Sequence, residues 1–359
     1  MKVCIIGSGL VSFTLANVLI KKHIFVDIFI TKKSNQYDPS RTLGISKSNV
    51  DYFNNEIFNI KKILWKIRSI KIFTEKEKKK ELLKFDNDND QIFSIIRNSQ
   101  LQKLLAGKLK NSKFAKFKYK IKNLNDMKDK YKLIINLDPK HPYIKKFFSN
   151  KIEKNYNSYA YTTTIIHKKI KNDTAFQNFT IKGPIAFLPI SETETSVVYS
   201  VRSLNMKKSS EMNNFVKKYN PTYSIKKINS WSSFKLKFSN LRNYYKNNFL
   251  VFGDLLHKIH PHAGQGFNMS LRDIKLLSSL IDNKINLGLD LDFTICQDFQ
   301  KKSKDKNLIF STGIDWIYEL FNFENKINSQ ILKNSINFVG NNKVVNSFFK
   351  KFADSGIRL

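Results

Sequence analysis

The first thirty residues combine apolar runs of strand length with an apolar stretch of helical spacing. Val3–Ile6 is a short, continuous apolar run, which is typical of a buried strand. Apolar side chains then recur through Leu15, Val18 and Leu19 at the spacing of one helix face. A second apolar run, Phe25–Ile30, predicts another strand. This order of strand, helix and strand favours an α/β fold.

Later segments predict a second sheet and a helical end. Two alternating strands within Trp65–Asp86 are joined by the charged turn Glu75–Glu81, and we expect them to join that second sheet. A buried strand runs from Tyr131 into Asp138. The other expected elements are strands at Tyr159–His167, Val197–Arg202 and Phe234–Phe238, a helix from Asn268 to about Leu280, and further helices that include Phe310–Tyr318.

Length and cysteine content limit the class of protein. At 359 residues and 41% hydrophobic composition, the chain is long enough for two substructures that share cores. Cys4 and Cys296 are its only cysteines, which argues against a disulfide framework and fits a reducing compartment. No segment approaches the ~18 apolar residues of a membrane span. We therefore expect a cytoplasmic protein, with peripheral contact at the inner face of the membrane left open.

The apolar start of the chain has an alternative interpretation as a signal peptide, because Lys2 precedes it. Two features argue against this alternative. The sequence Gly-Ser-Gly at 7–9 interrupts the apolar run, and no small-residue cleavage site precedes the strand at Phe25–Ile30.

The net charge of +34 raises nucleic acid as a partner. The lysines are spread along the chain, however, and no helix shows a base-reading pattern of Arg with Asn or Gln, so we expect no nucleic-acid partner. Codon bias in an AT-rich genome explains the abundance of Lys, Asn, Ile and Phe, and attraction to anionic membranes is the remaining alternative. Phe348–Phe352 mixes aromatic and basic residues, which suits a membrane or partner contact and suits buried helix packing equally well.

A glycine-containing turn connects the first strand to the first helix. In Gly7-Ser-Gly9-Leu-Val-Ser12, Gly7 permits a tight turn and Gly9 lets the backbone approach a pyrophosphate. Ser12 stands where a third glycine is usual, and its small side chain still permits close packing of helix on strand. The second strand ends in Thr31 instead of an acidic residue, so Thr31 is the candidate contact for a ribose. Asp27 lies too early and is expected to point into or across the sheet.

A second glycine-rich turn follows an apolar run late in the chain. Gly253 ends that run, and the carboxylate of Asp254 is suited to accept hydrogen bonds from a ribityl hydroxyl. The backbone amides of Gly264, Gln265 and Gly266 precede a helix, and we expect them to point at an electron-rich ring edge. Taken without its context, this Gly-Gln-Gly stretch is also compatible with an ordinary loop.

The late segment resembles the second flavin motif of the class A flavoprotein monooxygenases, the aromatic-hydroxylase family. It reads Gly-Asp-x-x-His at 253–257, His-Pro at 260–261, Gly-Gln-Gly-x-Asn at 264–268 and Arg-Asp at 272–273. Thr174–Ile190 resembles one subgroup, the ubiquinone-biosynthesis hydroxylases. The resemblance implies a Rossmann-like FAD-binding domain interleaved with a β-sheet substrate domain and followed by C-terminal helices, as in p-hydroxybenzoate hydroxylase.

This fold divides the chain into three expected parts. The FAD-binding domain is discontinuous and comprises residues 1–60, 88–150 and 243–285. The substrate domain comprises residues 61–87 and 151–242, and residues 286–359 form the helical region. Within the substrate domain, five apolar side chains are candidates for lining a pocket, although simple core packing is the alternative. They are Phe176, Phe179, Phe187, Leu188 and Phe238.

The resemblance also implies further cofactor contacts. Arg41 begins Arg-Thr-Leu-Gly-Ile-Ser, which is similar to the family segment whose arginine reaches the flavin, although a lone arginine is usually a surface residue. Asn98 matches a family asparagine, and Asn268 completes the late motif. Asp138 matches the aspartate that serves FAD and nicotinamide binding, with a plain strand-ending turn as the alternative.

The chain departs from the family at three cofactor positions. Ile30 replaces the ribose acid, Ser99 replaces an arginine, and Pro139 replaces a glycine. Arg97 and Gln100 are the nearest substitutes for the missing arginine. Proline removes an amide donor, and loss of arginine removes a bidentate phosphate contact, so both changes are expected to affect binding.

The activity implied is hydroxylation of a polyprenylated phenol or benzoquinol precursor in ubiquinone biosynthesis, through a flavin hydroperoxide. FAD is the implied cofactor, and NADH or NADPH is the implied reductant. His260 and Pro261 are expected to shape the reaction face. His257 is expected to be a structural residue near Asp254, and we expect no metal site despite the third histidine nearby, His262.

Two alternatives remain open at this point. One is a related flavoprotein oxidoreductase that acts on another lipid-like aromatic substrate. The other is a weakly active, flavin-binding scaffold within a complex of ubiquinone-biosynthesis proteins, which the departures at Ile30, Ser99 and Pro139 suggest. Retention of the whole second motif favours the enzyme.

Overall fold

The apolar runs near the two ends of the chain form a six-stranded sheet with the order β16-β17-β9-β1-β2-β8. A computed structural model describes residues 1–30, 40–75, 81–86, 91–119, 127, 130–202, 208–259 and 265–326. Five strands of this sheet are parallel, and β16 is antiparallel to β17. The strands are β1 (Lys2–Ile6), β2 (Phe25–Phe29), β8 (Ala115–Lys118), β9 (Leu133–Asn136), β16 (Tyr245–Lys246) and β17 (Phe249–Val251).

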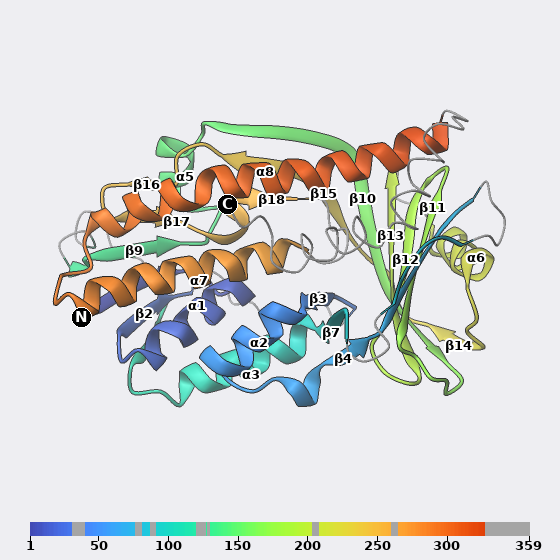
Figure 1. Cartoon of the computed structure of the whole chain (residues 1–359), viewed down its shortest axis with the longest axis horizontal. Helices are drawn as coiled ribbons and strands as arrows, with labels where there is room; N and C mark the ends of the chain where they lie inside the picture. Colours follow the sequence, from blue (N-terminus) through green and yellow to red (C-terminus); the bar gives the residue numbers. More distant parts are fainter. Residues whose placement is uncertain are drawn as a thin grey trace.

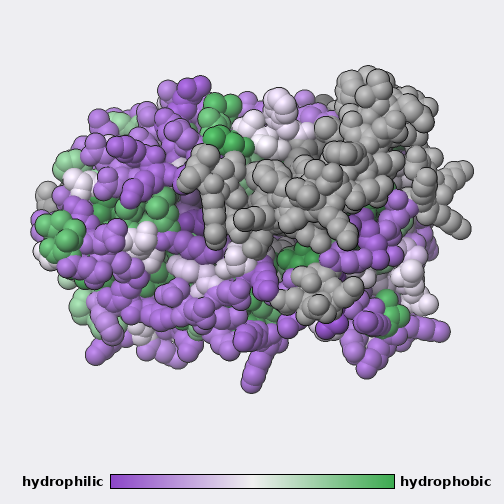
Figure 2. All heavy atoms as spheres, in the orientation of Figure 1, coloured by the Kyte–Doolittle hydropathy of each residue, from purple (hydrophilic) through white to green (hydrophobic). Residues whose placement is uncertain are grey.

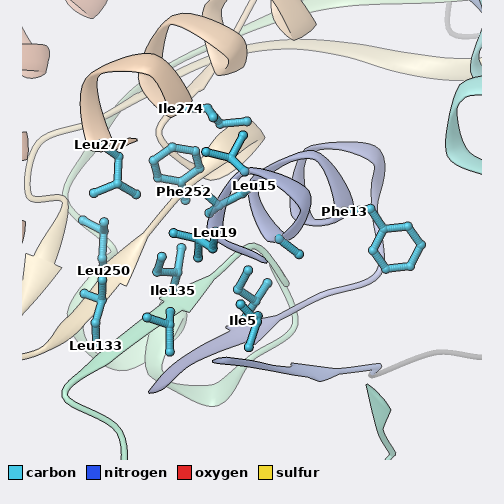
Figure 3. Packing of buried hydrophobic residues seen from close by; sticks show 14 of the residues in the cluster. Ile5, Phe13, Leu15, Leu19, Leu133, Ile135, Leu250, Phe252, Ile274 and Leu277 are labelled. Carbon is cyan, nitrogen blue, oxygen red and sulfur yellow. The ribbon is translucent and has the colours of Figure 1, made fainter. Parts of the chain in front are cut away.

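Helices pack on this sheet and bury a continuous apolar core. Ile5 of β1 and Ile135 of β9 lie opposite one another in the sheet. Leu15 and Leu19 of α1 pack near them together with Leu277 of α7, and all five side chains are fully buried (Figure 3). The helices of this part are α1 (Leu10–Lys21), α3 (Asn98–Lys110), α5 (Pro142–Phe147) and α7 (Gln265–Asn286).

A nine-stranded sheet forms the other end of the molecule (Figure 1). Its order is β18-β15-β10-β13-β12-β11-β5-β6, with β14 paired to β10. Helix α6 (Ser209–Tyr219) covers one face, where Met212 and Val216 pack against apolar strand residues. The strands are β5 (Ser69–Thr74), β6 (Glu81–Asp86), β10 (Lys151–His167), β11 (Thr174–Thr180), β12 (Gly183–Pro189), β13 (Glu194–Arg202), β14 (Ile225–Ile228), β15 (Ser232–Leu241) and β18 (His257–Lys258).

A three-stranded sheet, β3-β7-β4, connects the two large sheets. Polar side chains at the start of β3 and just before it bond to the nine-stranded sheet. Ser40 Oγ lies 3.0 Å from Thr162 Oγ1, and Thr42 donates to Ser196 Oγ at 3.0 Å. Arg41 lies between these two contacts in sequence. The elements here are β3 (Thr42–Ser46), α2 (Lys47–Glu56), η1 (Lys61–Ile63), β4 (Trp65–Ile67) and β7 (Phe93–Arg97).

The long helix α8 (Phe293–Lys326) runs along the molecule from the six-stranded sheet toward the nine-stranded sheet (Figure 1). Buried polar groups hold it in place. Asn307 donates to Asp273 Oδ1 of α7 at 3.0 Å, and Asn240 of β15 donates to Ser311 Oγ at 2.7 Å. Because both contacts are buried, α8 ties the two large sheets together.

The α/β class and the interleaved arrangement expected from the sequence are confirmed. Two expected elements differ in detail. Trp65–Asp86 contains three strands, of which β5 and β6 join the nine-stranded sheet, whereas β4 pairs with β7. Helix α7 begins at Gln265, before Asn268, and ends at Asn286. The division into domains at the stated boundaries stays a prediction.

The surface is dominated by hydrophilic residues, and the apolar side chains visible in Figure 2 lie in small separate groups. Leu287 and Trp316 are among the most exposed apolar residues, at 72% and 74%. Among the described helices, none is both long and apolar enough to cross a membrane. The segment Phe348–Phe352 lies outside the described residues.

A buried carboxylate, Asp27, joins three strands of the parallel sheet. Its side chain is 1% exposed, as expected for a residue pointing into the sheet. Lys2 Nζ lies 2.9 Å away, and Lys118 Nζ and the Tyr131 hydroxyl each donate to Asp27 at 2.5 Å. Burial opposes ionisation, but the hydrogen bonds from Lys118, Tyr131 and Lys2 prevail and hold the Asp27 pKa below its ordinary value.

This arrangement predicts a loss of stability in acid. A carboxyl whose pKa is lower in the folded state stabilises the fold above its unfolded pKa of about 3.9, and that contribution disappears as the pH falls through the folded pKa. We expect Asp27→Asn to lower the free energy of unfolding by about 2 kcal/mol at pH 7 and by less at pH 3. Urea unfolding across this pH range measures the difference, and a difference independent of pH contradicts the prediction.

Candidate functional site

The three central parallel strands end at one edge of the sheet, where the predicted glycine turns meet. Gly7 follows β1, Asp138 follows β9, and Gly253 follows β17, and these strands are neighbours. A Cβ added at Gly7 would lie 3.3 Å from Leu137, and a Cβ added at Gly253 would lie 3.2 Å from the same residue. The carboxyl edge of an open α/β sheet is where ligands bind in such folds. The turns therefore form one candidate site, although the sequence separates them by more than a hundred residues.

The first turn has two glycines with different requirements. Gly7 has a φ of +130°, which L side chains rarely adopt, and an added Cβ would lie 3.1 Å from Ser12 Oγ. Gly9 has extended backbone at the N-cap of α1, and an added Cβ would meet nothing within 4 Å. Gln102 of α3 donates to the Ser8 carbonyl at 2.8 Å and fixes the turn. The protein's own structure thus requires glycine at Gly7 and leaves open space beside Gly9.

This difference predicts two distinct outcomes for alanine substitution. Gly7→Ala is expected to lower the free energy of unfolding by about 1–3 kcal/mol, because it combines strain with a close contact. Gly9→Ala is expected to leave stability within about 0.5 kcal/mol and to weaken FAD binding several-fold. Thermal unfolding of the apoprotein and FAD titration separate the two effects. Equal loss of stability in both variants contradicts the assignment of Gly9 to ligand approach.

The late turn places Asp254 beside the first one. Gly253 has a φ of +67° and starts the short 3-10 turn η2 (Gly253–Leu255). An added Cβ at Gly253 would lie 3.4 Å from Val11 in the first turn of α1. Asp254, the next residue, is exposed. A carboxylate is therefore available at the edge of the sheet, next to the start of α1.

Helix α7 begins at Gln265 and presents its N-terminus to this region. An added Cβ at Gly266 would meet nothing within 4 Å, as at Gly9. The Asn268 side chain is fully engaged: Oδ1 accepts from Ser46 N at 3.1 Å and from Asn49 Nδ2 at 2.9 Å, and Nδ2 donates to the Gly44 carbonyl at 2.9 Å. Asn268 thus fixes the start of α7 against β3 and α2. Four predicted site residues, Thr31, His260, Pro261 and Gly264, lie outside the described residues.

Three of the predicted cofactor residues carry buried oxygen atoms that the described part of the chain leaves without a hydrogen-bond partner. They are Ser12 Oγ, Asn98 Oδ1 and Gln265 Oε1. An unsatisfied buried polar group costs about 1–3 kcal/mol, so such atoms usually mark a ligand or water position. Together with the open space at Gly9 and Gly266, they fit a ligand rich in hydroxyl and phosphate groups, as FAD is.

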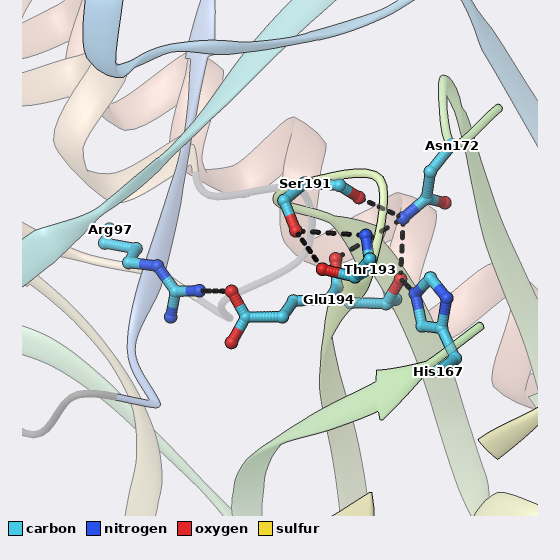
Figure 4. Close-up of polar contacts among 7 residues, drawn as sticks. Arg97, His167, Asn172, Ser191, Thr193 and Glu194 are labelled. Atoms are coloured by element: carbon cyan, nitrogen blue, oxygen red, sulfur yellow. Dashed lines mark hydrogen bonds and ion pairs between the residues drawn. The ribbon is translucent and has the colours of Figure 1, made fainter. Parts of the chain in front are cut away.

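Arg41 and Asn98 lie together at the junction with the nine-stranded sheet. The Asn98 backbone N–H donates to the Arg41 carbonyl at 3.1 Å, and the Arg41 guanidinium lies 4.5 Å from the centre of the Phe234 ring. Arg97, one of the two nearest substitutes for the missing arginine, forms an ion pair with Glu194 at 2.6 Å (Figure 4). Gln100, the other candidate substitute, is exposed on α3.

Glu194 is the first residue of β13 and follows a turn after β12 that buried side chains hold in shape (Figure 4). Asn172 donates to the Ser191 carbonyl at 2.7 Å and to Thr195 Oγ1 at 3.0 Å. His167 Nε2 lies 3.0 Å from the same Thr195 hydroxyl. The turn therefore offers Glu194 to Arg97 from a fixed position, and this ion pair links the start of α3 to the nine-stranded sheet.

Asp138 lies in the loop after β9 and is partly buried. Its carboxylate accepts from the Lys140 amide at 3.0 Å, and its backbone carbonyl accepts from Asn136 Nδ2 at 3.1 Å. Pro139 is exposed in this turn. These hydrogen bonds within the loop fit the alternative that Asp138 simply ends a strand in a turn. The position of Asp138 after β9, at the carboxyl edge of the sheet, also suits a contact with a ligand.

His257 is a buried, hydrogen-bonded structural residue, as expected, and its partner is Asp273. Its Nε2 lies 2.5 Å from Asp273 Oδ2, and both side chains are buried, at 0% and 2% exposure. Asp254, which is three residues away in sequence, is exposed instead. The reason is that α7 turns the Asp273 side chain toward β18, where His257 pairs with Asn240. His257 therefore joins the late turn to α7.

The five apolar candidates for one pocket do not all lie on one face, which corrects that expectation. Phe176 and Phe187 pack with α6, in the core on the far side of the nine-stranded sheet. Phe179 packs with edge strands, Phe238 with Tyr156 and Leu236, and Leu188 with β4 and β7. The alternative of core packing is therefore confirmed for Phe176 and Phe187.

The face of the nine-stranded sheet opposite α6 is the one that meets β3, β4 and β7. Strand register and the packing of Ala175 and Leu188 against Ile67 and Ile95 define this face, which we call the inner face. Glu194 of β13, opposite Ile166 of β10, lies at one end of this face and pairs with Arg97, and the other described side chains of the face that the strand register places there are uncharged. They are Ile70, Ile72, Thr74, Ala160, Thr162, Thr164, Ala175, Gln177, Phe179, Pro184, Ala186, Leu188, Ser196, Val198, Ser200, Ser232 and Phe234.

Solved structures share this arrangement of a parallel sheet and a large second sheet. The p-nitrophenol 4-monooxygenase PnpA from Pseudomonas putida superposes with a TM-score of 0.77 at 13% identity, over 99% of this chain and 98% of that one. HpxO of Klebsiella pneumoniae, complexed with FAD and uric acid, gives 0.75 at 9% identity, over 99% and 97%. The fold is thus that of the FAD-dependent monooxygenases.

The chain belongs to the squalene epoxidase family, whose model matches residues 130–347. The ubiquinone biosynthesis monooxygenase COQ6 of Dictyostelium discoideum is 23% identical over 424 residues, which cover 89% of this chain and 84% of that protein. COQ6 of Caenorhabditis elegans is 26% identical, and the 3-demethoxyubiquinol 3-hydroxylase of Escherichia coli is 27% identical. These two matches span less than half of each relative, 43% and 44%. The resemblance to class A monooxygenases and to ubiquinone-biosynthesis hydroxylases is confirmed.

Sequence reasoning missed two residues of this region. Gln102, which holds the Ser8 carbonyl, lies four residues after Asn98 on α3. Residues at this spacing share one helix face, so the position of Asn98 was a usable signal. Gln177 lies on the inner face, and no local pattern distinguishes that face from the one under α6.

Proposed function

We propose that the protein is an FAD-dependent monooxygenase that hydroxylates the ring of a polyprenylated phenol or benzoquinol precursor in ubiquinone biosynthesis. Its similarity to a ubiquinone biosynthesis monooxygenase and to a 3-demethoxyubiquinol 3-hydroxylase supports the reaction class. The observation that carries the substrate class is the aliphatic middle of the inner face, because Ile72, Ala186 and Val198 offer no cation that could pair with an anionic aromatic acid there. Small and aliphatic side chains such as Ala186 and Val198 suit a neutral, lipid-like ring.

The residues at the edge of the parallel sheet are proposed to hold FAD. Gly7, Gly9 and Ser12 would bind the pyrophosphate at the N-terminus of α1, and Asp254 would accept from the ribityl chain. The N-terminus of α7 would stabilise negative charge at the flavin ring. When bound, FAD supplies hydride acceptance and oxygen activation, with NADH or NADPH as the proposed reductant. A cofactor of this class explains the partnerless oxygens of Ser12, Asn98 and Gln265.

The protein's own tasks in this proposal are orientation and exclusion of water. Arg41 and Asn98 lie at the junction between the proposed cofactor site and the inner face. The ion pair of Arg97 with Glu194 links the start of α3 to the nine-stranded sheet. His260 and Pro261 are proposed to shape the reaction face, and Thr31, Asp138, Gly264 and Asn268 complete the proposed cofactor set. Peripheral contact with the membrane and with other ubiquinone-biosynthesis proteins is supported by the charge of +34.

Purification and a visible spectrum test the cofactor first. A flavin spectrum, or its appearance after incubation with FAD, is expected, and no bound flavin in excess FAD would refute the central proposal. The FAD-loaded protein is then incubated with NADH or NADPH and a short-chain prenylphenol. A product with one added oxygen atom by mass spectrometry is the expected result. Flavin binding without product would favour the scaffold alternative, and a lack of accumulated ubiquinone intermediates after removal of the gene would refute the pathway.

A further inference from the structure

A single row of side chains crosses the middle of the inner face. Gln177 of β11 lies opposite Ile72 of β5 and Ala186 of β12. Ala186 in turn lies opposite Val198 of β13, and Val198 opposite Thr162 of β10. Side chains directly opposite in neighbouring strands project from the same face of a sheet. Gln177 therefore shares its surface with Ile72, Ala186, Val198 and Thr162.

Two contacts orient this row toward the proposed cofactor site. Thr162, at its far end, bonds to Ser40, which precedes Arg41. Ala175 lies two residues before Gln177 on the same strand, so it has the same orientation, and it packs against Ile67 and Ile95 of the small sheet. Asn178, the next residue, pairs with Ile185 and so faces α6.

Gln177 and Thr162 are the two polar side chains of this row. Thr162 and Ser196 are bonded to the segment around Arg41, whereas the Gln177 side chain is half-buried and has no hydrogen-bond partner among the described residues. Its flanking neighbours in the row, Ile72 and Ala186, are aliphatic and half-buried. Partial burial of an amide between aliphatic groups is unfavourable unless a partner satisfies it. The Gln177 amide atoms are not fully buried, so they remain accessible to a ligand at this face.

We propose that Gln177 determines substrate specificity by forming a hydrogen bond with an oxygen on the substrate ring. This inference rests on the proposed hydroxylase function. An amide both donates and accepts, so it suits a phenol hydroxyl as well as a quinone-type carbonyl. It is also neutral, in keeping with its uncharged neighbours in the row, Ile72 and Ala186. The aliphatic neighbours contact the ring, and Gln177 selects for the oxygen substituent.

The test compares a prenylphenol with the same prenylated benzene lacking the hydroxyl. Both are titrated into the FAD-loaded protein by calorimetry, with Gln177→Leu and the matched control Asn178→Leu, whose side chain lies on the opposite face. Wild type and Asn178→Leu are expected to bind the phenol about tenfold more tightly than the analogue. Gln177→Leu is expected to bind the two compounds equally, while its flavin content and thermal stability remain those of the wild type.

The outcomes separate this inference from the proposed function. If wild type binds and hydroxylates the phenol and Gln177→Leu keeps the tenfold preference, the inference is overturned and the function stands. If wild type binds FAD but neither compound, both are overturned. Gln177→Glu gives a second measurement, because it keeps an acceptor of similar size. If Gln177→Glu restores the preference for the phenol, because its glutamate accepts from the hydroxyl, direct contact is supported. If Asn178→Leu also loses the preference, the effect is a general one on the sheet and the inference is overturned.

Discussion

Replacing Asp254 by alanine is expected to weaken FAD binding by about 10- to 100-fold without destabilising the apoprotein. The side chain is exposed at the carboxyl edge of the sheet, so the fold does not depend on it. A hydrogen bond to a charged acceptor contributes about 1.5–3 kcal/mol, which corresponds to this range of affinity. Asp254→Asn keeps one acceptor oxygen and loses the charge, so an intermediate affinity is expected.

Fluorescence titration of the apoproteins with FAD measures this effect. Asp298→Ala is a suitable control because Asp298 is an exposed aspartate on α8, away from the edge of the parallel sheet. It removes the same charge and is expected to leave FAD affinity unchanged. Wild-type affinity in Asp254→Ala, or an equal loss in both variants, would remove Asp254 from the cofactor site.

The central strands of the parallel sheet could be predicted because β1, β9 and β17 are short, largely apolar runs. Such strands can be recognised without knowing their neighbours, because a strand buried on both faces is apolar along its length. The three-stranded sheet was not foreseen. Thr42–Ser46 contains Gly44 and polar residues, and only its pairing with Phe93–Arg97, far away in sequence, makes it a strand. Tertiary context decides such short elements.

The candidate site shows the same division between local and long-range information. Gly7 and Gly253 could be identified because their positive φ is a local requirement that few residues meet. The partner of His257 could not, because proximity in sequence favours Asp254 while helix α7 brings in Asp273. Likewise, alternation within β11 separates Phe176 from Gln177, but only the packing of α6 reveals which of the two faces is the core.

Replacing Asp273 by alanine is expected to lower the free energy of unfolding by about 3 kcal/mol, because it leaves two buried polar groups without their acceptor. Asp273 accepts from His257 Nε2 at 2.5 Å and from Asn307 Nδ2 at 3.0 Å. It thereby joins the late glycine turn, α7 and α8. Urea unfolding of the apoprotein measures the loss, and Asp298→Ala on the exposed side of α8 is expected to change it by less than about 0.5 kcal/mol.

A double-mutant cycle distinguishes a specific buried pair from general damage to the core. With His257→Ala, Asp273→Ala and the double variant, a coupling energy of about 1–3 kcal/mol is expected for groups in direct contact. The double variant should therefore be less destabilised than the sum of the two single variants. Strict additivity would mean that the contact contributes nothing beyond packing. Because Asn268 bonds to Gly44, Ser46 and Asn49, its replacement by alanine should also reduce FAD content.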